Sequence, residues 1–478
     1  MNVKLTDRAK WRGEVTVVPA FAGPFKGRVA GGIPLKGLKI GETEGETTTV
    51  RSGTREAVLV SLGKRKDCTQ DTFRRAGGII ATWLAQRKIR RAGVDLASAE
   101  TSRDDGAVTA LGEGLVLGAF RFAEHKPSAK AAPRARVDLL VDQPVPTSLD
   151  RLERAVAACE ATNLAREVAH QPPNVLNPIS LAERAKELAA ANGLKCTVLD
   201  EKQMRQLGMG AVLAVGGGSD TPPRLIVLEY EGAKGGKPLA LVGKAITFDT
   251  GGYSIKTRES IVGMKYDKCG GAAVLGVMQA VATLKPNMPV VGVIAAAENM
   301  VSGAAYRPDD IITTLSGKTV EIVSADAEGR MVLCDALTYT QQQYKPRAII
   351  DLATLTGGVL IALGRHRAGL FCNDDKLRDA LVASGERTHE RLWALPLDND
   401  YLEALKGDDA DLKNSAGREG HAILGAMFLK QFVDGRTPWG HLDIAGVADV
   451  DKDQPYCPKG ATGFGVRLLA DFIDHTCE

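Results

Sequence analysis

Residues 319–344, TVEIVSADAEGRMVLCDALTYTQQQY, hold the pattern that decides the fold. The first five residues are largely β-branched and predict a strand, whereas the apolar spacing over 331–344 predicts a helix. The polar segment SADAEGR, at 324–330, joins the two. A strand, a short polar loop and a helix form the repeating unit of α/β folds. This stretch therefore predicts one such unit.

The same alternation continues on both sides of this stretch. Further strands are expected at residues 196–199, 224–230, 238–243, 289–297, 348–353 and 441–444, and helices at 179–192, 270–284, 376–389 and 421–432. Strands that alternate with helices predict an α/β fold with a mainly parallel or mixed sheet. Ligands of such folds bind beyond the carboxyl ends of the strands.

The first third of the chain predicts a second, smaller α/β domain. Strands are expected at residues 15–18, 56–62 and 137–141, helices at 71–91, 112–122 and 148–168, and a polar loop at 125–134. A chain of 478 residues is too long for one compact core. We place the boundary near residue 145, which gives an N-terminal domain at 1–145 with an assembly or regulatory role. The larger domain, at 146–478, has a mixed central sheet.

Composition narrows the classes of protein. Apolar residues make up 44% and charged residues 25% of the chain, which is typical of a folded globular protein. No apolar run approaches the ~20 residues of a membrane span, and the polar N-terminus does not resemble a secretion signal. We therefore expect a cytoplasmic protein without membrane contact. The eight cysteines show no C-x-x-C spacing, and the net charge of +3 indicates no particular partner.

Two polar clusters follow expected strands. Lys244, Asp249, Lys256 and Asp267 come after the strand at 238–243, and Asp326, Glu328 and Arg330 come after the strand at 319–323. If the second segment is extended, its three charged residues share one face, because they are spaced two apart. Oxygen ligands suit Mg and Mn and are tolerated by Zn. Carboxylates can bridge two cations ~3.5–4 Å apart, an arrangement used in hydrolysis.

Other interpretations of these residues remain open. Taken singly, each acid or lysine is more typical of a solvated surface, and acids are common where helices begin. Their convergence beyond strands is what favours a site. The seven histidines form no H-E-x-x-H motif, and no G-x-S-x-G motif is present. The basic run at 87–91 is more typical of a solvated helix end than of a nucleic-acid patch.

Several ordered motifs resemble the leucyl aminopeptidase family, the M17-type cytosol aminopeptidases. They are VGKAITFDTGGYSIK at 242–256, MKYD at 264–267, SADAEGR at 324–330, DLATLTG at 351–357 and HLDIAG at 441–446. The resemblance covers nearly all of the second domain and is loose over the first 145 residues. It implies a metallo-exopeptidase whose catalytic domain is the larger one, at 146–478.

The resemblance also implies roles for individual residues. The metal ligands would be Lys244, Asp249, Asp267, Asp326 and Glu328, and the substrate-binding residues would be Met264, Thr354, Leu355, Gly357 and Ala445. The ligands would hold two divalent ions, Mn or Zn, with Mg as a further option. Lys256 would stabilise the oxyanion, and Arg330 would hold a bicarbonate ion that acts as general base. A lysine ligand must be neutral, so its pKa has to fall below ~10.4.

Substrates would be peptides with a free N-terminus, and the family forms homohexamers. The chain departs from the family pattern at Ser324 and Ala325, which replace Asn and Thr, and at Ala245, Thr250 and Ala416. None of these changes removes an expected ligand. A nucleic-acid-binding or assembly protein on the same scaffold is the main alternative. A different di-metal hydrolase, such as a phosphoesterase, is a weaker one, because a lysine ligand argues against it.

Overall fold

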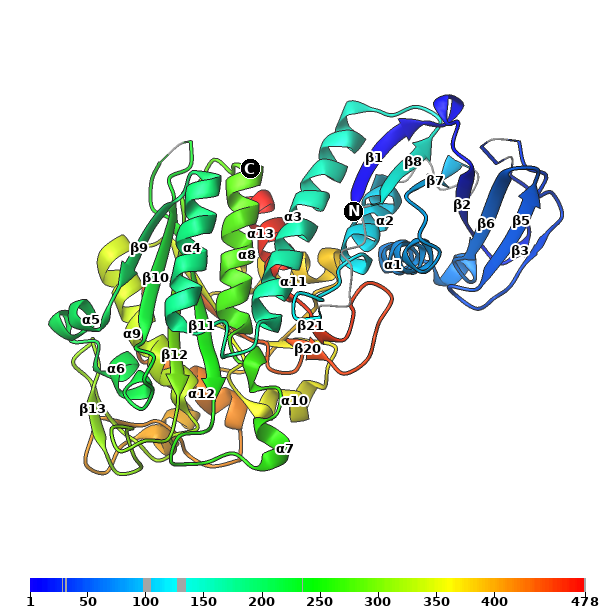
Figure 1. The fold of residues 1–478 in the computed structure, drawn as a ribbon. Coiled ribbons are helices and arrows are strands. Elements are labelled where there is room, and N and C mark those ends of the chain that lie inside the picture. Colours follow the sequence, from blue (N-terminus) through cyan, green and yellow to red (C-terminus); the bar gives the residue numbers. More distant parts are fainter. Residues whose placement is uncertain (28, 31, 98–104, 127–134, 234, 477–478) are drawn as a thin grey trace. The chain divides into compact units, whose positions relative to one another are not determined.

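The computed structural model describes residues 1–27, 29–30, 32–97, 105–126, 135–233 and 235–476, and it divides into two compact units (Figure 1). Unit 1 comprises Met1–Glu160 and Val450–Gly460, and unit 2 comprises Ala161–Asp449 and Ala461–Glu478. The division falls within helix α3 (Pro146–His170), whereas the boundary proposed near residue 145 precedes this helix. Both units are α/β, so the expected two-domain α/β fold is confirmed.

Unit 1 contains a six-stranded sheet with the order β1-β8-β7-β2-β6-β5. These strands are β1 (Asn2–Asp7), β8 (Arg136–Val141), β7 (Arg91–Asp95), β2 (Val15–Ala20), β6 (Arg55–Ser61) and β5 (Thr47–Ser52). All neighbours are parallel except β5 and β6. Helices α1 (Gln70–Gln86) and α2 (Asp105–Gly118) share a hydrophobic core with the sheet.

Helix α1 is shorter than the expected helix at 71–91, which is a correction. It ends at Gln86, Lys88 adopts a left-handed backbone with φ 57°, and Arg91 already begins β7. A left-handed residue cannot continue an α-helix, so the basic run lies in the turn and not on the helix. The expected helix at 112–122 starts earlier and ends at Gly118. Residues 127–134 of the expected polar loop lie outside the described residues.

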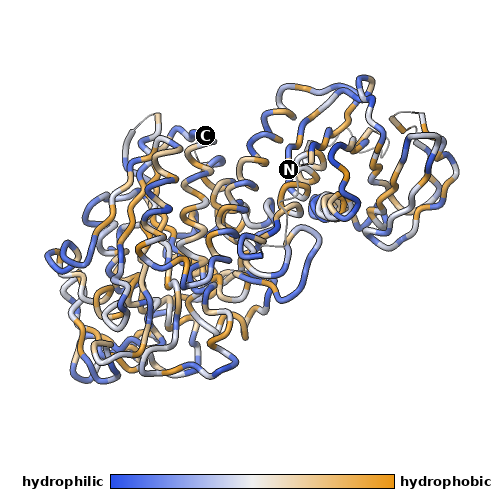
Figure 2. Tube along the Cα trace, in the orientation of Figure 1, coloured by the Kyte–Doolittle hydropathy of each residue, from blue (hydrophilic) through white to orange (hydrophobic). Residues whose placement is uncertain are grey.

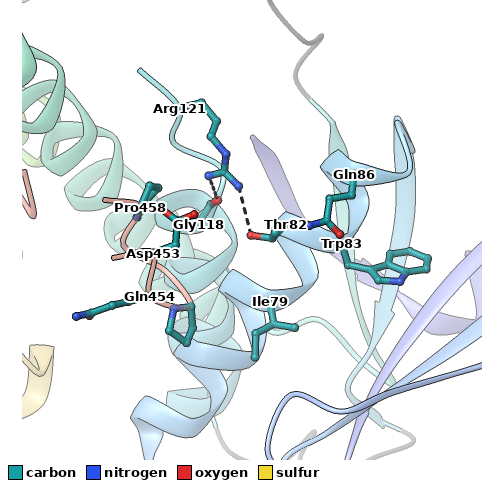
Figure 3. A pocket seen from close by; sticks show the side chains of 10 residues that line it. Ile79, Thr82, Trp83, Gln86, Gly118, Arg121, Asp453, Gln454 and Pro458 are labelled. Carbon is teal, nitrogen blue, oxygen red and sulfur yellow. Dashed lines mark hydrogen bonds between the residues drawn. The ribbon is translucent and has the colours of Figure 1, made fainter. Parts of the chain in front are cut away.

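A small pocket lies between α1 and the 453–458 segment of unit 1 (Figure 3). Its volume is about 280 Å³, and its lining includes Trp83 and Pro455. The Arg121 guanidinium at its edge donates to the Gly118 carbonyl oxygen at 2.9 Å and to Thr82 Oγ1 at 3.4 Å. Through these contacts the Arg121 guanidinium caps the last carbonyl of α2 and links it to α1.

Unit 2 contains an eight-stranded mixed sheet with the order β17-β16-β19-β15-β11-β12-β10-β9. The strands are β17 (Leu392–Ala394), β16 (Ala368–Cys372), β19 (Trp439–Asp443), β15 (Ala348–Ala353), β11 (Leu239–Asp249), β12 (Val290–Asn299), β10 (Arg224–Tyr230) and β9 (Lys195–Leu199). The central strands β12, β11, β15 and β19 are parallel, and β10 and β16 run antiparallel to their inner neighbours. Figure 2 shows hydrophobic residues along much of these central strands.

Helices cover both faces of this sheet. Helices α6 (Gly210–Gly216), α9 (Glu328–Tyr344) and α12 (His421–Lys430) share one hydrophobic core with the central strands. Helix α8 (Cys269–Leu284) packs on the other face, where Gly243 meets Gly271 so closely that a Cβ on Gly243 would lie 2.7 Å from the Gly271 Cα. Among the described residues, no helix combines the length and apolarity needed to cross a membrane.

A β-bulge in β11 decides which side chains face α9. The strand extends to Asp249, so the expectation that it ends before Lys244 is wrong. In a regular strand these two residues, five apart, would point to opposite faces. The register shifts at Thr247, however, so that Lys244 pairs with Ala295 and Asp249 pairs with Asn299. Both charged side chains therefore lie on the same face of the sheet.

The 319–344 segment forms a strand and a helix, but its strand lies outside the central sheet. Strand β14 (Thr319–Glu321) belongs to a three-stranded sheet with β13 (Ile311–Thr313) and β18 (Leu412–Lys413). Helix α9 begins at Glu328. The expected extended arrangement of the 326–330 residues is therefore wrong. Glu328 and Arg330 are about 200° apart around the helix axis and point to different sides.

Candidate metal centre

Lys244 lies at the centre of a buried charge cluster in unit 2. Its side chain extends from the middle of β11 and is only 2% exposed. Its Nζ lies 2.8 Å from Glu328 Oε1 and 2.9 Å from Asp267 Oδ1, and it donates to the Thr354 carbonyl oxygen at 2.9 Å. A Cβ on Gly329 would lie 2.7 Å from this Nζ, so the glycine lets the start of α9 approach the lysine.

Lys256 holds the second half of the cluster. The chain turns at Gly251 and Gly252, both with positive φ, which glycine adopts without strain. This turn brings Lys256 Nζ to 2.7 Å from Asp249 Oδ2 and into close contact with Asp326 Oδ1. Carboxylate oxygens of Asp249, Asp326 and Glu328 lie within 4.8 Å of one another. Asp267 is linked to these carboxylates by Lys244, which forms ion pairs with both Asp267 and Glu328.

The cluster has the chemistry of a cation site. Asp267 Oδ2 and Glu328 Oε2 are buried oxygens that accept no hydrogen bond from the described residues. Burial raises the pKa of Asp267 to about 6, against the opposing charge of Lys244. Burial, and then the charge of Asp249, raise the pKa of Glu328 to about 8. Crowded carboxylates with unpartnered oxygens are stabilised by bound cations, so these residues fit divalent metal ions.

The carboxylates of the cluster raise the pKa of both lysines. Burial lowers the pKa of Lys244, but Asp267, Glu328 and Asp249 more than offset it, so that the pKa is raised. The balance at Lys256 is the same, with Asp249 as the main carboxylate. A lysine ligand requires a lowered pKa, and we predict that bound metal ions lower the pKa of Lys244.

The main chain of the 324–326 segment is fixed by side chains from other loops. The Ala325 carbonyl oxygen accepts from Asn299 Nδ2 at 2.9 Å and from Tyr306 Oη at 2.7 Å. The Ala325 N–H donates to Ser254 Oγ at 3.0 Å. Since all three contacts use backbone atoms, the segment keeps its shape with alanine in place of the expected threonine.

Arg330 is buried, and no salt bridge between described residues includes its guanidinium. It is 2% exposed, its Nη1 donates to the Asn414 carbonyl oxygen at 2.7 Å, and its Nε has no partner in the described part of the chain. Burial lowers its pKa to about 10, although Glu328 and Asp443 act in the opposite direction. A buried guanidinium with an unpartnered N–H fits a small anion.

Three of the expected substrate-binding residues lie on the loops that follow β15 and β19. Thr354 Oγ1 donates to Asp267 Oδ1 at 2.7 Å. The backbone N–H groups of Leu355 and Ala445 donate to Asp443 Oδ1 at 3.1 and 3.2 Å. Two further residues begin short helices: Gly357 is the first residue of α10 (Gly357–Leu363), and Met264 is the first of the 3₁₀ turn η4 (Met264–Tyr266), directly before Asp267.

Three buried residues that support the cluster were not singled out from the sequence. Asn299 ends β12 and Asp443 ends β19, so a search of every strand exit would have found both. Asn414 lies just after β18 and accepts the backbone N–H groups of Val323 and Ser324 at 2.8 and 3.1 Å. No role was expected for Asn414, although the departure from the family pattern at Ala416 lies in the same segment.

Comparison with known proteins gives family matches along most of the chain. The profile of the cytosol aminopeptidase family, catalytic domain, matches residues 163–470, and that of the family's N-terminal domain matches residues 35–128. A probable cytosol aminopeptidase of Roseiflexus castenholzii is 47% identical over 421 residues, which cover 87% of this chain and 86% of that protein. One of Geobacter sulfurreducens is 47% identical over 429 residues, with 88% and 85% covered.

Solved structures are similar over nearly the whole chain. The bottromycin maturation enzyme BotP in complex with Mn has a TM-score of 0.88 and 33% sequence identity, covering 97% of this chain and all of that chain. A mutant of tomato leucine aminopeptidase has a TM-score of 0.87 and 33% identity, covering 99% of this chain and 95% of that chain.

Proposed function

Because this chain belongs to the cytosol aminopeptidase family and is a peptidase, we propose that it releases N-terminal amino acids from peptides with two bound divalent cations. One observation carries the proposal. Five expected ligands from separate parts of the chain form one cluster, of which four are buried and Asp326 is exposed, and two of the buried carboxylate oxygens lack a partner among the described residues. The ligands are Lys244, Asp249, Asp267, Asp326 and Glu328.

We assign the ligands to two positions. Lys244 and Asp267 would hold one cation, Asp326 would hold the other, and Asp249 and Glu328 would contact both. When bound, two such cations lower the pKa of a water molecule and polarise the carbonyl of the scissile bond. Mn is the metal in the similar BotP structure, and oxygen-rich sites also accept Zn and Mg.

Lys256 and Arg330 would act on the substrate and on the attacking water. The Lys256 side chain is 14% exposed and reaches the edge of the cluster, where its N–H groups can donate to the oxyanion of the tetrahedral intermediate. Arg330 would hold a bicarbonate ion, with its unpartnered Nε as one donor. An anion held by Arg330 in this position would supply a general base beside the centre.

The substrates we propose are peptides with a free N-terminus, because the family consists of aminopeptidases. Met264, Thr354, Leu355, Gly357 and Ala445 would contact the first residue of the substrate. The relatives are named cytosol aminopeptidases, and we propose the cytoplasm as the location and a homohexamer as the assembly.

The alternative of a nucleic-acid-binding protein has weaker support in the structure. Arg87 lies 3.2 Å from Glu56 and stacks on the Trp83 ring, and Arg91 lies 3.7 Å from Asp138 and stacks on Trp11. These side chains of the basic run are therefore engaged within unit 1. A mobility shift with duplex DNA whose strength falls steeply with salt would favour the alternative.

The proposed function is tested with a panel of aminoacyl amides and metal-stripped protein. We expect release of the amino acid after addition of Mn or Zn, and none from the matching N-acetylated amides. Glu328→Gln should lower the rate by about 10²-fold or more, because it removes the charge of a shared ligand. Absence of release with Mn, Zn and Mg alike would refute the proposal.

A further inference from the structure

We propose that Asn299 is a positioning residue that joins the two halves of the metal centre through its single side-chain amide. This inference rests on the proposed function and concerns a residue outside the expected ligand set. One half of the centre follows β11 and contains Asp249. The other half is the loop before α9 and contains Asp326. Apart from the charged Lys256, whose Nζ contacts Asp249 and Asp326, Asn299 is the side chain among the described residues that donates to both halves.

Asn299 is held rigidly at the end of β12. It is fully buried, and it is the register partner of Asp249 across the parallel pair β11 and β12. Its own carbonyl oxygen accepts from the Thr250 N–H at 2.9 Å and from Thr250 Oγ1 at 2.8 Å. These contacts fix the backbone at the ends of β11 and β12 independently of the Asn299 side chain.

The side-chain amide restricts how Asp249 can face the centre. Asn299 Nδ2 donates to Asp249 Oδ1 at 2.8 Å, and the Gly251 N–H donates to the same oxygen at 2.8 Å. Two donors saturate this oxygen and stop the carboxylate from rotating. The second oxygen, Oδ2, is the one that faces Lys256 Nζ at 2.7 Å. Asn299 thus holds Asp249 so that its Oδ2 faces the centre.

The same nitrogen also fixes the loop that carries Asp326. Its second hydrogen points to the Ala325 carbonyl oxygen at 2.9 Å, directly before Asp326 in the chain. Both neighbours of Nδ2 are acceptors, so only a residue with two N–H donors satisfies them together. Aspartate has the same shape but has no donor when ionised, and it would place a third oxygen against two others.

The contacts of Asn299 predict an unequal effect on the two cations. The Asp326 position depends on Asn299 through both Asp249 and Ala325. The cation position formed by Lys244 and Asp267 is supported separately. Thr354 Oγ1 donates a hydrogen bond to Asp267, and the Thr354 carbonyl oxygen accepts one from Lys244 Nζ. Loss of the amide should therefore weaken the cation at Asp326 more than the cation at Asp267.

The test uses the full chain, stripped of metal and titrated with Mn²⁺ by calorimetry. In Asn299→Leu, which keeps the volume but removes both donors, we expect one Mn²⁺ to bind about 10–100-fold more weakly, as is usual for residues behind a ligand. The other should change by less than about threefold. Asn299→Ala should behave in the same way. Tyr306→Phe, which removes only the second donor to Ala325, should weaken the same cation by a smaller factor.

Asn373→Leu, at an exposed position outside the candidate centre, is the control. The Asn373 side chain also bridges two backbone groups, since it donates to the Thr437 carbonyl oxygen at 3.0 Å and accepts the Trp439 N–H at 2.7 Å. It lies beside the amino end of β19, whereas the candidate centre lies at the carboxyl ends of the central strands. Its variant should bind both cations with wild-type affinity, even if its thermal unfolding shifts as much as that of Asn299→Leu.

Two outcomes separate this inference from the proposed function. If wild-type protein binds two Mn²⁺ and releases amino acids, but Asn299→Leu binds both with wild-type affinity, only the inference is refuted. Equal weakening of both cations, in proportion to lost thermal stability, would also refute it, because that result indicates a general structural role. If wild-type protein binds no Mn²⁺, the proposed function fails first.

Discussion

At the scale of single residues, the two lysines of the centre differ in their surroundings. Lys244 is enclosed by β11, α9 and the Thr354 loop, whereas Lys256 sits on a glycine turn at the edge. Only Lys256 can therefore meet a substrate without a change in the backbone. This difference supports the proposed division between a ligand and an electrophile.

Lys256→Met should separate chemistry from metal binding. The variant keeps the length of the side chain but loses the donor for the oxyanion, so kcat should fall about 10²–10³-fold. The number of Mn²⁺ ions bound per chain should stay at two, because Lys256 is not an assigned ligand. Parallel measurement of initial rates and of bound metal by equilibrium dialysis checks this. Loss of a metal ion together with the rate would contradict the assigned role.

The charged residues of the candidate site were singled out because they follow expected strands, and their roles were expected from the resemblance to a known family. The residues behind the ligands could not be predicted. Asn299 and Asn414 act through hydrogen bonds to backbone atoms of distant segments, and such partners are set by the fold and not by neighbours in sequence. Asp443 lay within the quoted HLDIAG motif, but its four hydrogen bonds to the Leu355–Thr356 loop and to Ala445 appear only in three dimensions.

At the scale of elements, alternation of strands and helices predicted most of unit 2, and the errors have physical causes. The bulge at Thr247 lengthens β11 beyond the regular apolar pattern and turns Asp249 to the face of Lys244. Strict alternation cannot predict an extra residue of this kind. The extended reading of the 326–330 segment failed because α9 starts at Glu328, where acidic residues are favoured by the helix dipole.

A buried pair between β15 and β19 should make stability depend on pH. His441 Nδ1 lies 2.5 Å from Asp351 Oδ1, and both side chains are fully buried. Burial lowers the pKa of His441, but Asp351 more than offsets this, so the pKa lies above its ordinary value of 6.5. The pair therefore contributes its full stability below about pH 6.5, and this contribution is lost as the pH rises through the folded-state pKa.

Asp351→Asn is the variant that tests this dependence. It removes the charge that raises the pKa of His441 and should flatten the decline in unfolding free energy above about pH 6.5. Urea unfolding of metal-stripped protein at several pH values provides the measurement. If wild type and variant decline with the same slope, the pair does not carry the effect.

At the scale of the whole molecule, the candidate metal centre lies entirely within unit 2, and unit 1 has its own core. The two-domain organisation followed from chain length alone, but the membership of residues 450–460 in unit 1 did not. These residues are distant in sequence from the rest of unit 1. They pack there because Tyr456 Oη donates to Asp71 at 2.9 Å and Pro455 meets Gly78 on α1.

Gly114→Val should affect unit 1 without changing the centre. A Cβ at this position would lie 1.8 Å from the Arg74 carbonyl oxygen, so α1 and α2 would have to separate. We expect a loss of about 1–3 kcal/mol in the stability of unit 1, as for overpacked cores. Calorimetric unfolding should show this loss, while Mn²⁺ binding in unit 2 stays at two per chain. Ala85→Val, at an exposed position of α1, serves as the control.

The central claim is that two cations in one cluster enable release of N-terminal amino acids. The most direct measurement is the rate of release from a short peptide as Mn²⁺ is added stepwise to metal-stripped protein. The rate should rise until two equivalents per chain are bound and then stay constant, and Glu328→Gln should show little activity at any ratio. A rate that saturates at one equivalent, or that is independent of Mn²⁺, would contradict the claim.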